Sequence, residues 1–534
     1  MSVRPQAIPP VPEETARIAQ AALPKGNTYI QMRDEFGTFF QDEDFLDLFS
    51  ERGQPAEAPW RLALVMVMQY AEGLTDRQAA DAVRTRIDWK YALSLEITDP
   101  GFDFSVMSEF RSRFITHEAE RRLFDLVLRQ FRARGWVKER GKQRTDATHV
   151  LAAIRAVNRL ECVGETMRHA LNVLAEVAPD WLIENMHSSW AERYKTRFTD
   201  FRLPKDEKAR IALAEEIGAD GGDLLEKVYA STSFPWLREL PAIEIVRRIW
   251  LQQYHASEKG ASWRADQELP PSAVLLSSPY DVEAHYSKKR NVGWVGYKVH
   301  FTEGCDTDQP HFVLEVTTTA ATTPDGDIME DLHERLAKKE VFPNEHFVDT
   351  GYVDAQILAN SQQMHQIDLV GPVIPDTSWQ TKDAERFTHS HFDIDWEDKS
   401  VTCPAGEKSQ SWGYINDRHG KPALRVRFSL PTCRACPLHA QCTQSQARVL
   451  FLRPDEHSYQ ALQNARQRQE TPEFRVSYAK RAGIEGTIAQ AVRTCEIRRS
   501  RYIGLKKLNL QAFLTATSMN VLRACHWLTE ETIM

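Results

Sequence analysis

Hydrophobic residues recur at helical spacing through most of the first quarter of the chain. The stretch PWRLALVMVMQYAEG is strongly apolar and predicts a buried helix. The next stretch begins with Thr75 and Gln78 at the spacing of a capping box, in which the two side chains satisfy free backbone donors. The run that begins SVMSEFRSRF continues the helical pattern. Residues 28–140 are therefore predicted to form a helical domain, whereas residues 1–27, rich in Pro, Ala and Gln, are expected to be a disordered tail.

Strand-like and helical runs alternate after this domain. A strand-like run around Asp146 is followed by a long helical stretch over residues 155–265. GYKVHFTE (296–303) and HFVLEVTTTA (311–320) are rich in β-forming residues and predict an antiparallel pair. A helix, a short strand that ends at Asp349, a second helix and another strand follow. This order predicts an α/β core that a helical insertion interrupts.

A second insertion is expected over residues 376–470, which contain a group of cysteines. Residues 471–534 are again largely helical. The core is therefore assigned to residues 141–375 and 471–534. The predicted fold class is a mixture of α+β and α/β, with two insertions in the core and a helical domain before it.

Composition narrows the classes of protein that fit this pattern. The chain has 534 residues, 42% of them hydrophobic, which is ordinary for a globular protein of several domains. Its net charge of −8 means that any surface for nucleic acid must be local. The first residues lack the apolar run of a signal peptide, and 18 uninterrupted apolar residues occur nowhere, so we expect a cytoplasmic protein without a membrane span. Eight cysteines in such a chain favour thiols or a metal site over disulfides.

Three acidic residues in distinctive local strings are candidates for a shared metal site. Asp146 and Asp349 follow or lie in strand-like runs, and Glu485 lies on a predicted helix. Mg²⁺ prefers oxygen ligands and usually takes one or two carboxylates together with substrate phosphates. Two such ions can activate an attacking oxygen and stabilise a leaving oxygen on phosphorus. The three carboxylates therefore indicate metal-dependent chemistry on a phosphodiester.

The surroundings of Glu485 add to this interpretation. Tyr478, Arg481 and Glu485 are spaced i, i+3, i+7 and would share one face of an α-helix. A guanidinium beside a carboxylate suits phosphate binding. Gly483 and Gly486 flank the glutamate although each glycine costs a helix about 1 kcal/mol relative to alanine. Close approach of DNA is one reason for small residues there.

Several of these strings resemble the DDE-type insertion-sequence transposases of bacteria. They are RTDATHV, YSKKRNVGWVGYKVHFTE, FVDTGYVDA, CRACPLHAQC and YAKRAGIEGTIAQAVR, and the similarity extends over roughly residues 30–525. The resemblance implies an RNase H-like core in which Asp146 and Asp349 bind metal from strands and Glu485 completes the triad from the last core helix. The signature helix of this class usually has a basic residue seven positions after the glutamate. Here that position is Val492, and Arg493 follows it.

The resemblance also implies an activity and its partners. Two Mg²⁺ or Mn²⁺ ions would support cleavage at the ends of an element and transfer of the freed 3′-hydroxyl to target DNA. The partners would be double-stranded DNA with terminal inverted repeats, target DNA and a second copy of the chain in a homodimer at the bacterial nucleoid. Two alternatives stay open: a metal-dependent nuclease that does not join strands, and a domesticated DNA-binding protein without catalysis.

Each carboxylate also has a simpler interpretation. An aspartate after a strand is often a turn former or a helix cap, which fits both Asp146 and Asp349. Asp354 is a candidate cap for the next helix and a rival ligand to Asp349. Glu485 would then be a solvated helix residue. The arginines of the helical domain are equally open, either near DNA phosphates or solvated on a helical bundle: Arg77, Arg84, Arg86, Arg111 and Arg113.

The cysteines of the second insertion suggest a structural zinc site. Cys433 and Cys436 form a CxxC, Cys442 follows, and Cys403 lies 29 residues before Cys433. Four thiolates suit tetrahedral zinc, with His439 as a substitute ligand. The alternative is four reduced cysteines in a small β-rich insertion. The other four cysteines are expected in hydrophobic cores.

Local basic runs are the expected contacts for DNA phosphates. The candidates are Lys288, Lys289, Arg290, Arg498 and Arg499, in addition to Tyr478, Arg481 and Arg493. Lys506 and Lys507 form a further basic pair. Trp379, after a predicted strand, is a candidate to stack on an extruded base, with core packing as the equal alternative.

Overall fold

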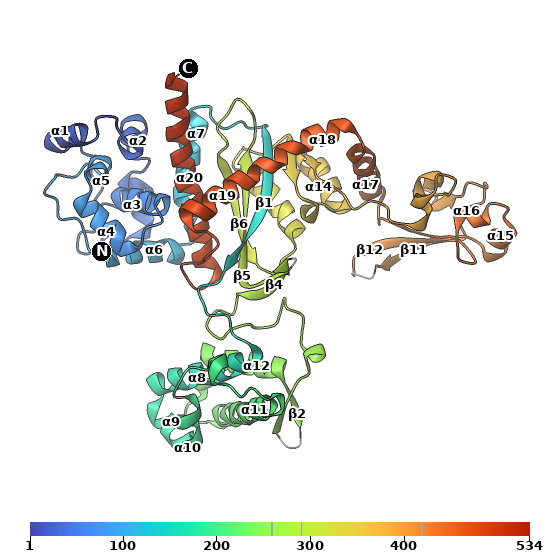
Figure 1. The fold of residues 1–534 in the computed structure, drawn as a ribbon, viewed down its shortest axis with the longest axis horizontal. Coiled ribbons are helices and arrows are strands. Elements are labelled where there is room, and N and C mark those ends of the chain that lie inside the picture. The colour runs from blue at the N-terminus through green and yellow to red at the C-terminus, as the bar shows by residue number, and fades with distance from the viewer. Residues whose placement is uncertain (258–259, 290, 418–419, 534) are drawn as a thin grey trace.

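A six-stranded mixed sheet lies at the centre of the protein (Figure 1). The computed structural model describes residues 1–257, 260–289, 291–417 and 420–533. The strands follow the order β4-β5-β1-β7-β8, and β6 also pairs with β5. Their bounds are β1 Lys142–Leu151, β4 His285–Lys289, β5 Val292–Gly304, β6 Val313–Ala320, β7 Glu345–Val348 and β8 Asp368–Val370. The predicted mixed α/β architecture behind a helical N-terminal region is confirmed.

Strand directions place β1 between an antiparallel and a parallel neighbour. β1 runs antiparallel to β5 and parallel to β7, and β7 runs parallel to β8. β5 and β6 form the antiparallel pair that their β-forming residues predict. Helices pack around the sheet, with α19 against β1 and α20 against β6. The bounds of the core helices are α13 Met329–Lys338, α14 Ala355–His365, α19 Ile484–Cys495 and α20 Leu505–Ile533, with the 3-10 turns η5 Asp325–Ile328 and η6 Thr350–Tyr352.

The N-terminal region is helical as predicted. α3 is buried along almost its whole length, and Thr75 and Gln78 form the expected capping box at the start of α4. The last core helix joins this region to the sheet, because the Ser518 hydroxyl on α20 donates to the carbonyl of Val67 on α3. The elements are α1 Glu13–Ala22, α2 Thr28–Phe36, η1 Asp42–Leu48, α3 Pro59–Ala71, α4 Asp76–Thr85, α5 Ile87–Ala92, α6 Ser105–Thr116 and α7 Arg122–Ala133.

Residues 1–27 are more ordered than their composition predicts. They contain the helix α1, in which Thr15 and Ala19 are buried. The Thr15 hydroxyl donates to the carbonyl of Leu95, 2.8 Å away. A small buried face, which compositional reasoning does not register, fixes this segment on the helical domain.

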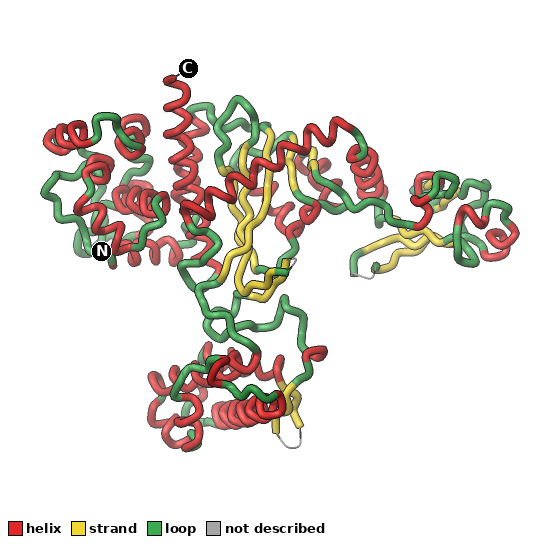
Figure 2. Tube along the Cα trace, viewed as in Figure 1, coloured by secondary structure: helices red, strands yellow, loops and turns green. Residues whose placement is uncertain are grey.

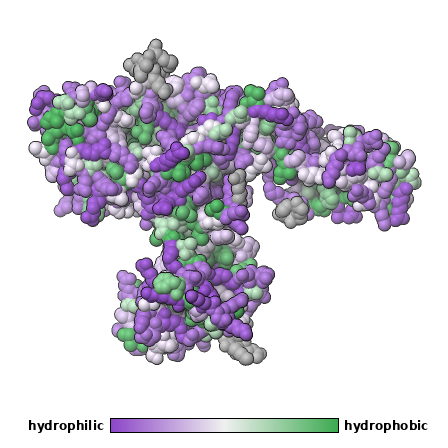
Figure 3. Space-filling view, in the orientation of Figure 1, coloured by the Kyte–Doolittle hydropathy of each residue, from purple (hydrophilic) through white to green (hydrophobic). Residues whose placement is uncertain are grey.

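Residues 155–265, here called the helical lobe, lie apart from the sheet (Figure 1). The lobe has its own hydrophobic core, with Trp190, Ile217 and Ile249 among the buried residues. On the face seen in Figure 3, hydrophobic residues gather where the lobe joins the central body. Its elements are α8 Arg159–Val177, α9 Pro179–Asn185, α10 Ser188–Tyr194, η2 Asp200–Arg202, α11 Glu207–Ala230, η3 Pro235–Glu239, α12 Pro241–Gln253 and the paired strands β2 Tyr254–Ser257 and β3 Gly260–Trp263. The 3-10 turn η4 Asp266–Glu268 follows directly after the lobe.

Residues 376–470, here called the cysteine lobe, project from another side of the sheet. Figure 2 shows strands in this lobe and in the centre, whereas the N-terminal region contains helices and loops. The hydrophobic core of the lobe is small. Its projecting elements are η7 Trp379–Lys382, η8 His389–His391, β9 Asp393–Asp395, β10 Ser400–Thr402, β11 Ser411–Asn416, β12 Pro422–Arg427, α15 Leu430–Ala435, α16 His439–Cys442 and β13 Val449–Leu452. The helix α17 Glu456–Gln469 ends this stretch and packs against α14 of the core (Figure 1). None of the helices in the described residues is long and apolar enough to cross a membrane.

Candidate active site

Asp146 and Asp349 lie side by side at neighbouring strands. The parallel register of β1 and β7 pairs Thr145 with Val348. Asp146 directly follows Thr145, and Asp349 directly follows Val348. Neighbouring strands lie about 4.8 Å apart, so the two carboxylates reach a common space. Each also bonds a neighbouring backbone N–H: Asp146 accepts from Ala147 at 2.7 Å and Asp349 from Thr350 at 2.6 Å. Asp349 therefore forms a turn, as its simpler interpretation predicts, and also lies beside Asp146.

Arg481 connects Asp146 to Glu485. Its Nη2 donates to Oδ2 of Asp146, and its Nη1 donates to Oε1 of Glu485 at 3.2 Å. The Asp146 and Arg481 side chains are each 15% exposed, whereas Glu485 is 69% exposed. A cationic group therefore lies between two of the three predicted carboxylates, which are far apart in the sequence.

The environment of Asp146 disfavours its charged form. Burial raises the pKa of this carboxyl above its ordinary value, and Asp349 adds to the effect. The positive charges of Arg481 and Lys289 and the bond from the Ala147 N–H oppose the shift without cancelling it. A buried acid with a raised pKa in a cleft is typical of a functional site, because a bound cation would restore its charge.

A cavity of ≈ 640 Å³ opens beside these groups, here called the carboxylate cavity. Asp146 and Glu485 line it together with the basic residues Lys289, Arg493 and Arg498. It is therefore bordered by acids that suit a cation and by bases that suit phosphate.

Val492, Arg493 and Trp294 also line the carboxylate cavity. Arg493 is one position beyond residue 492, where the signature helix usually has its basic residue, and it still reaches the cavity. Trp294 lines it as well, and its ring lies 5.4 Å from that of His149. Trp379 does not: Arg386 covers its ring at 4.7 Å in the cysteine lobe. The stacking role of Trp379 stays a prediction, and Trp294, which follows a basic run, is a second aromatic candidate at this cavity.

Tyr478, Arg481 and Glu485 do not share one continuous α-helix. α18 (Pro472–Tyr478) ends at the tyrosine, a 3-10 turn η9 (Ala479–Gly483) carries the arginine, and α19 carries the glutamate. The Lys480 carbonyl in this turn accepts a hydrogen bond from Arg144 on β1. Tyr478 stacks on Phe474 with ring centroids 5.4 Å apart.

The two glycines beside Glu485 have different surroundings. A Cβ at Gly483 would lie 1.9 Å from Nη1 of Arg144, so a side chain is excluded by the protein itself. A Cβ at Gly486 would meet nothing within 4 Å. Close approach of DNA is thus unnecessary to explain Gly483 and remains an interpretation for Gly486 alone.

The remaining basic candidates are scattered around this site. Lys288 and Lys289 are exposed on β4, and Arg290 lies outside the described residues. Arg498 donates from Nε to the Thr148 hydroxyl at 3.1 Å. Arg499 is exposed, and its backbone forms an isolated bridge with Leu151.

Most arginines of the helical domain are engaged within it. Arg111 is buried and pairs with Asp76. Arg86 pairs with both Glu72 and Asp88. Arg113 bonds the Leu48 carbonyl, Arg84 bonds that of Pro100, and Arg77 lies over the ring of Phe104. These contacts favour the bundle interpretation for these side chains.

Asp354 is occupied elsewhere. It caps α14 by accepting from the Ile357 N–H at 2.9 Å and pairs with Lys421 at 2.8 Å. This arrangement favours Asp349 over Asp354 as the second carboxylate.

The four cysteines of the cysteine lobe gather around one small cavity of ≈ 40 Å³. We call Cys403, Cys433, Cys436 and Cys442 the cysteine cluster. His439 lines the same cavity, and its buried Nε2 has no hydrogen-bond partner among the described residues. Burial raises the pKa of Cys442 to about 11, and the three other thiols add to the shift. The remaining four cysteines are buried, as expected, and all eight are free.

Neither group of side chains is in ligand geometry. In the described part of the chain, no three His, Cys, Asp or Glu side chains are arranged to hold an ion. Both candidate metal sites therefore rest on the chemistry and proximity of their donors.

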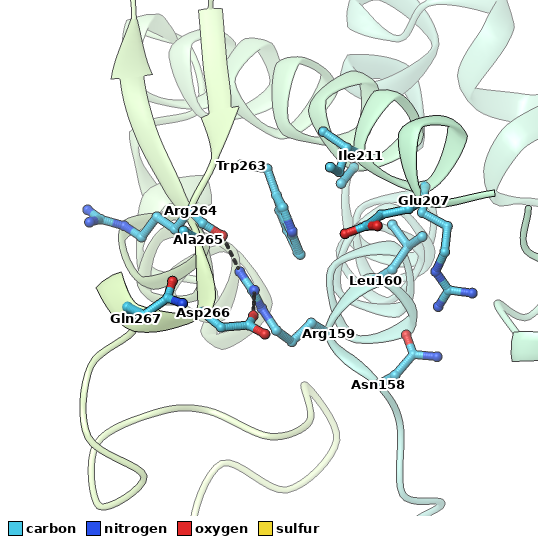
Figure 4. Close-up of a pocket in the computed structure, with 12 residues that line it drawn as sticks. Asn158, Arg159, Leu160, Glu207, Ile211, Trp263, Arg264, Ala265, Asp266 and Gln267 are labelled. Atoms are coloured by element: carbon cyan, nitrogen blue, oxygen red, sulfur yellow. Dashed lines mark hydrogen bonds and ion pairs between the residues drawn. The ribbon is translucent and has the colours of Figure 1, made fainter. Parts of the chain in front are cut away.

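A further cavity, of ≈ 550 Å³, lies in the helical lobe (Figure 4). Arg159 is its central basic residue, but it lies 4.3 Å over the ring of Trp263 and pairs with Asp266. It also donates to the Arg264 carbonyl at 3.0 Å. Arg210 and Arg264 also line this cavity, and they bond Asp200 and the Tyr254 carbonyl. Its cations are therefore engaged within the lobe, and none of the three candidate carboxylates lines it, so the carboxylate cavity is the stronger candidate.

Two family models match the chain. Residues 17–113 match a transposase domain (DUF772), and residues 402–525 match a transposase DDE domain. The second match includes the cysteine cluster and Glu485, whereas Asp146 and Asp349 lie outside both. No curated protein and no solved structure matches the chain.

Proposed function

The chain belongs to the DDE-type insertion-sequence transposases, and we propose that it cleaves and joins DNA at the terminal inverted repeats of its element. Asp146, Asp349 and Glu485 are assigned as the ligands of two Mg²⁺ or Mn²⁺ ions within an RNase H-like core. The observation that carries the proposal is the position of Arg481, whose guanidinium joins Asp146 to Glu485 at the carboxylate cavity. The positive charge of Arg481 thus lies where the carboxylates of Asp146 and Glu485 approach each other.

The donor set fits the proposed ions. Carboxylate oxygens are the ligands that Mg²⁺ prefers, and the register of β1 and β7 places two of them together. When bound, the ions would activate the attacking oxygen and stabilise the leaving oxygen at phosphorus. The protein's part is to place Asp146 beside Asp349 and to present Glu485 from α19.

Arg481 has a second role in this proposal. With cations at the carboxylates, its guanidinium would be free to pair with a DNA phosphate, for which a planar fork of donors is suited. In the part of the chain that the structure describes, its buried Nε has no hydrogen-bond partner. The guanidinium would therefore exchange the carboxylates of Asp146 and Glu485 for a DNA phosphate.

The surface around the carboxylate cavity suits a DNA backbone. The cavity is lined by Lys289, Arg493 and Arg498. The adjacent residues Lys288 and Arg499 are exposed. These contacts would give affinity that falls with salt and is independent of sequence. Two DNA ends must be held at once, which favours a homodimer at the nucleoid. The helical domain over residues 28–140 is the proposed DNA-binding domain, because residues 17–113 match a transposase domain.

The test uses purified protein, a plasmid with the element's own ends, and Mg²⁺. Wild type is compared with Glu485→Gln and with Glu473→Gln, an exposed residue of α18 that undergoes the same charge change. We expect metal-dependent end cleavage and joining in wild type and Glu473→Gln and neither in Glu485→Gln. Cleavage without joining would indicate the nuclease alternative. End binding without cleavage in all three proteins would indicate a DNA-binding protein without catalysis.

We also propose that the cysteine cluster binds one structural zinc ion. Four thiols and the unpartnered Nε2 of His439 surround a cavity of ≈ 40 Å³, and tetrahedral zinc takes four such ligands. Zinc content per chain is the measurement, in wild type, Cys436→Ser, His439→Asn and the control Cys305→Ala, which lies outside the cluster. We expect loss of zinc in Cys436→Ser alone. Loss in His439→Asn as well would make the histidine a ligand, and a zinc-free wild type would contradict the proposal.

A further inference from the structure

A buried ion pair links the strand of Asp146 to the region around Glu485. Arg144 lies two residues before Asp146 on β1, and its Nε donates to Oε1 of Glu303 on β5 at 2.7 Å. The Glu303 side chain is fully buried, and that of Arg144 is 9% exposed. The same guanidinium donates from Nη1 to the Lys480 carbonyl at 2.7 Å, in the turn just before Arg481.

The second oxygen of Glu303 extends this network to the helices. Oε2 accepts from the Thr487 hydroxyl and from Nη1 of Arg523 on α20, the latter at 3.0 Å. Arg523 also donates from Nη2 to the Thr487 hydroxyl at 2.6 Å. Thr487 lies on α19 two residues after Glu485. The network therefore holds the chain on both sides of Glu485, at Lys480 and at Thr487.

The local sequence is adapted to this network. The Arg144 guanidinium occupies the space that a side chain at residue 483 would need, at 1.9 Å from the ideal Cβ. Glu485 itself is largely exposed and contacts Arg481, which cannot fix a helix by itself. Behind the carboxylates, Ile484 and Ile488 pack α19 into the main hydrophobic core, and the polar network adds directional contacts on both sides of Glu485.

We propose that Arg144 and Glu303 are positioning residues that set the separation of Asp146 and Glu485 for metal binding. The inference rests on the proposed function, because it concerns the same carboxylates. Groups behind a metal site orient its ligands, and their loss typically weakens metal affinity about 10- to 100-fold. A pair with this role must affect metal affinity beyond its effect on folding.

The chain provides a matched control. Glu315 on β6 is also fully buried, and it pairs with Arg121 at 2.9 Å, with Lys339 at 2.8 Å and with Arg335 at 3.6 Å. Arg121→Gln therefore removes one cation from a buried glutamate of the same sheet, as Arg144→Gln does. Arg121 lies on the side of the helical domain and contacts none of the three carboxylates of the proposed triad.

The experiment measures Mn²⁺ affinity by electron paramagnetic resonance and the Mg²⁺ concentration for half-maximal end cleavage. For Arg144→Gln we expect both constants to rise by roughly tenfold or more, with Arg121→Gln within about twofold of wild type although both variants lose thermal stability. Unchanged metal constants in Arg144→Gln, or an equal rise in both variants, would overturn the proposal. If wild type shows no metal-dependent cleavage, the proposed function fails instead.

A second variant covers the case in which Arg144→Gln does not fold. Gly483→Ala forces its methyl group against the Arg144 guanidinium and should weaken Mn²⁺ binding in the same way. Gly486→Ala, where a Cβ meets nothing, is the control on the same helix. Equal Mn²⁺ affinity in both alanine variants would overturn the proposal.

Discussion

The two candidate metal sites are built in opposite ways. The carboxylate centre joins residues that are 335 positions apart, Asp146 and Arg481, and is held by a large hydrophobic core. The cysteine cluster comes from a single stretch, 403–442, in a lobe with a small core formed by Phe392, Val401, Leu424, Val426, Phe428, Leu450 and Leu452.

The difference in core size indicates which of the two metal sites is needed for folding. A small unit buries too little apolar surface to fold securely and commonly needs a metal or disulfides. The cysteine lobe is such a unit and has thiols at hand. The carboxylate centre instead has Arg481 to neutralise its charges and a complete sheet behind it. We therefore expect zinc to be part of the fold and Mg²⁺ to be needed for chemistry alone.

The largest expected effect is the loss of the cysteine lobe's fold when zinc is removed. Structural zinc contributes about 10 kcal/mol or more to the folding of small domains. After treatment with a strong chelator, limited proteolysis should cut within residues 393–452, whereas the helical lobe, with its own core, resists. Equal susceptibility of the two lobes would break the comparison.

A second prediction concerns Asp146→Asn. End cleavage should fall by roughly 10³-fold, as expected when a charge-stabilising group is lost. The melting temperature should stay equal or rise, because burial of this carboxyl raises its pKa and disfavours its charge. Asp354→Asn, at the cap of α14, is the control and should keep cleavage. Loss of cleavage in that variant would make the rival aspartate a ligand.

A third prediction uses the buried histidines beneath the carboxylate centre. Burial lowers the pKa of His300 and of His333 to about 3. The unfolded chain takes up their protons near pH 6.5 and the folded chain does not, so stability should fall as pH falls from about 6.5 toward 3. The slope is at most about 1.4 kcal/mol per pH unit for each histidine.

Urea midpoints at pH 7 and pH 5 measure this effect. His333 donates to or accepts from His346 at 2.9 Å, and His346 bonds the Thr145 hydroxyl at 2.7 Å, next to Asp146. His333→Asn should flatten the dependence on pH. Equal midpoints at the two pH values would contradict the prediction.

The smallest expected effect is that of Gly486→Ala. Because this position is open, the substitution should stabilise α19 by about 1 kcal/mol. The melting temperature measures it in the absence of DNA. A destabilised variant would mean that Gly486, like Gly483, has a neighbour that excludes a side chain.

Much of the site's framework could be predicted from sequence. The strand before Asp349, the helix that carries Glu485 and the antiparallel pair of β5 and β6 follow from local periodicity and residue type. Local patterns also located the cysteine cluster.

The contacts that hold the site together could not be predicted this way. The bond of Arg144 to Glu303 spans 159 residues, and no local pattern records it. The helical spacing of Tyr478 and Glu485 missed the 3-10 turn between them, because a distant guanidinium competes for the Lys480 carbonyl.

The central claim is that Asp349 binds a metal ion together with Asp146 and Glu485. The most direct test is Asp349→Cys, with end cleavage measured in Mg²⁺ and in Mn²⁺. A thiolate is a poor ligand for Mg²⁺ and a better one for Mn²⁺, so direct ligation predicts a Mn²⁺-to-Mg²⁺ activity ratio about tenfold or more above that of wild type. An active variant with the same ratio as wild type, or one that neither ion restores, would contradict the claim.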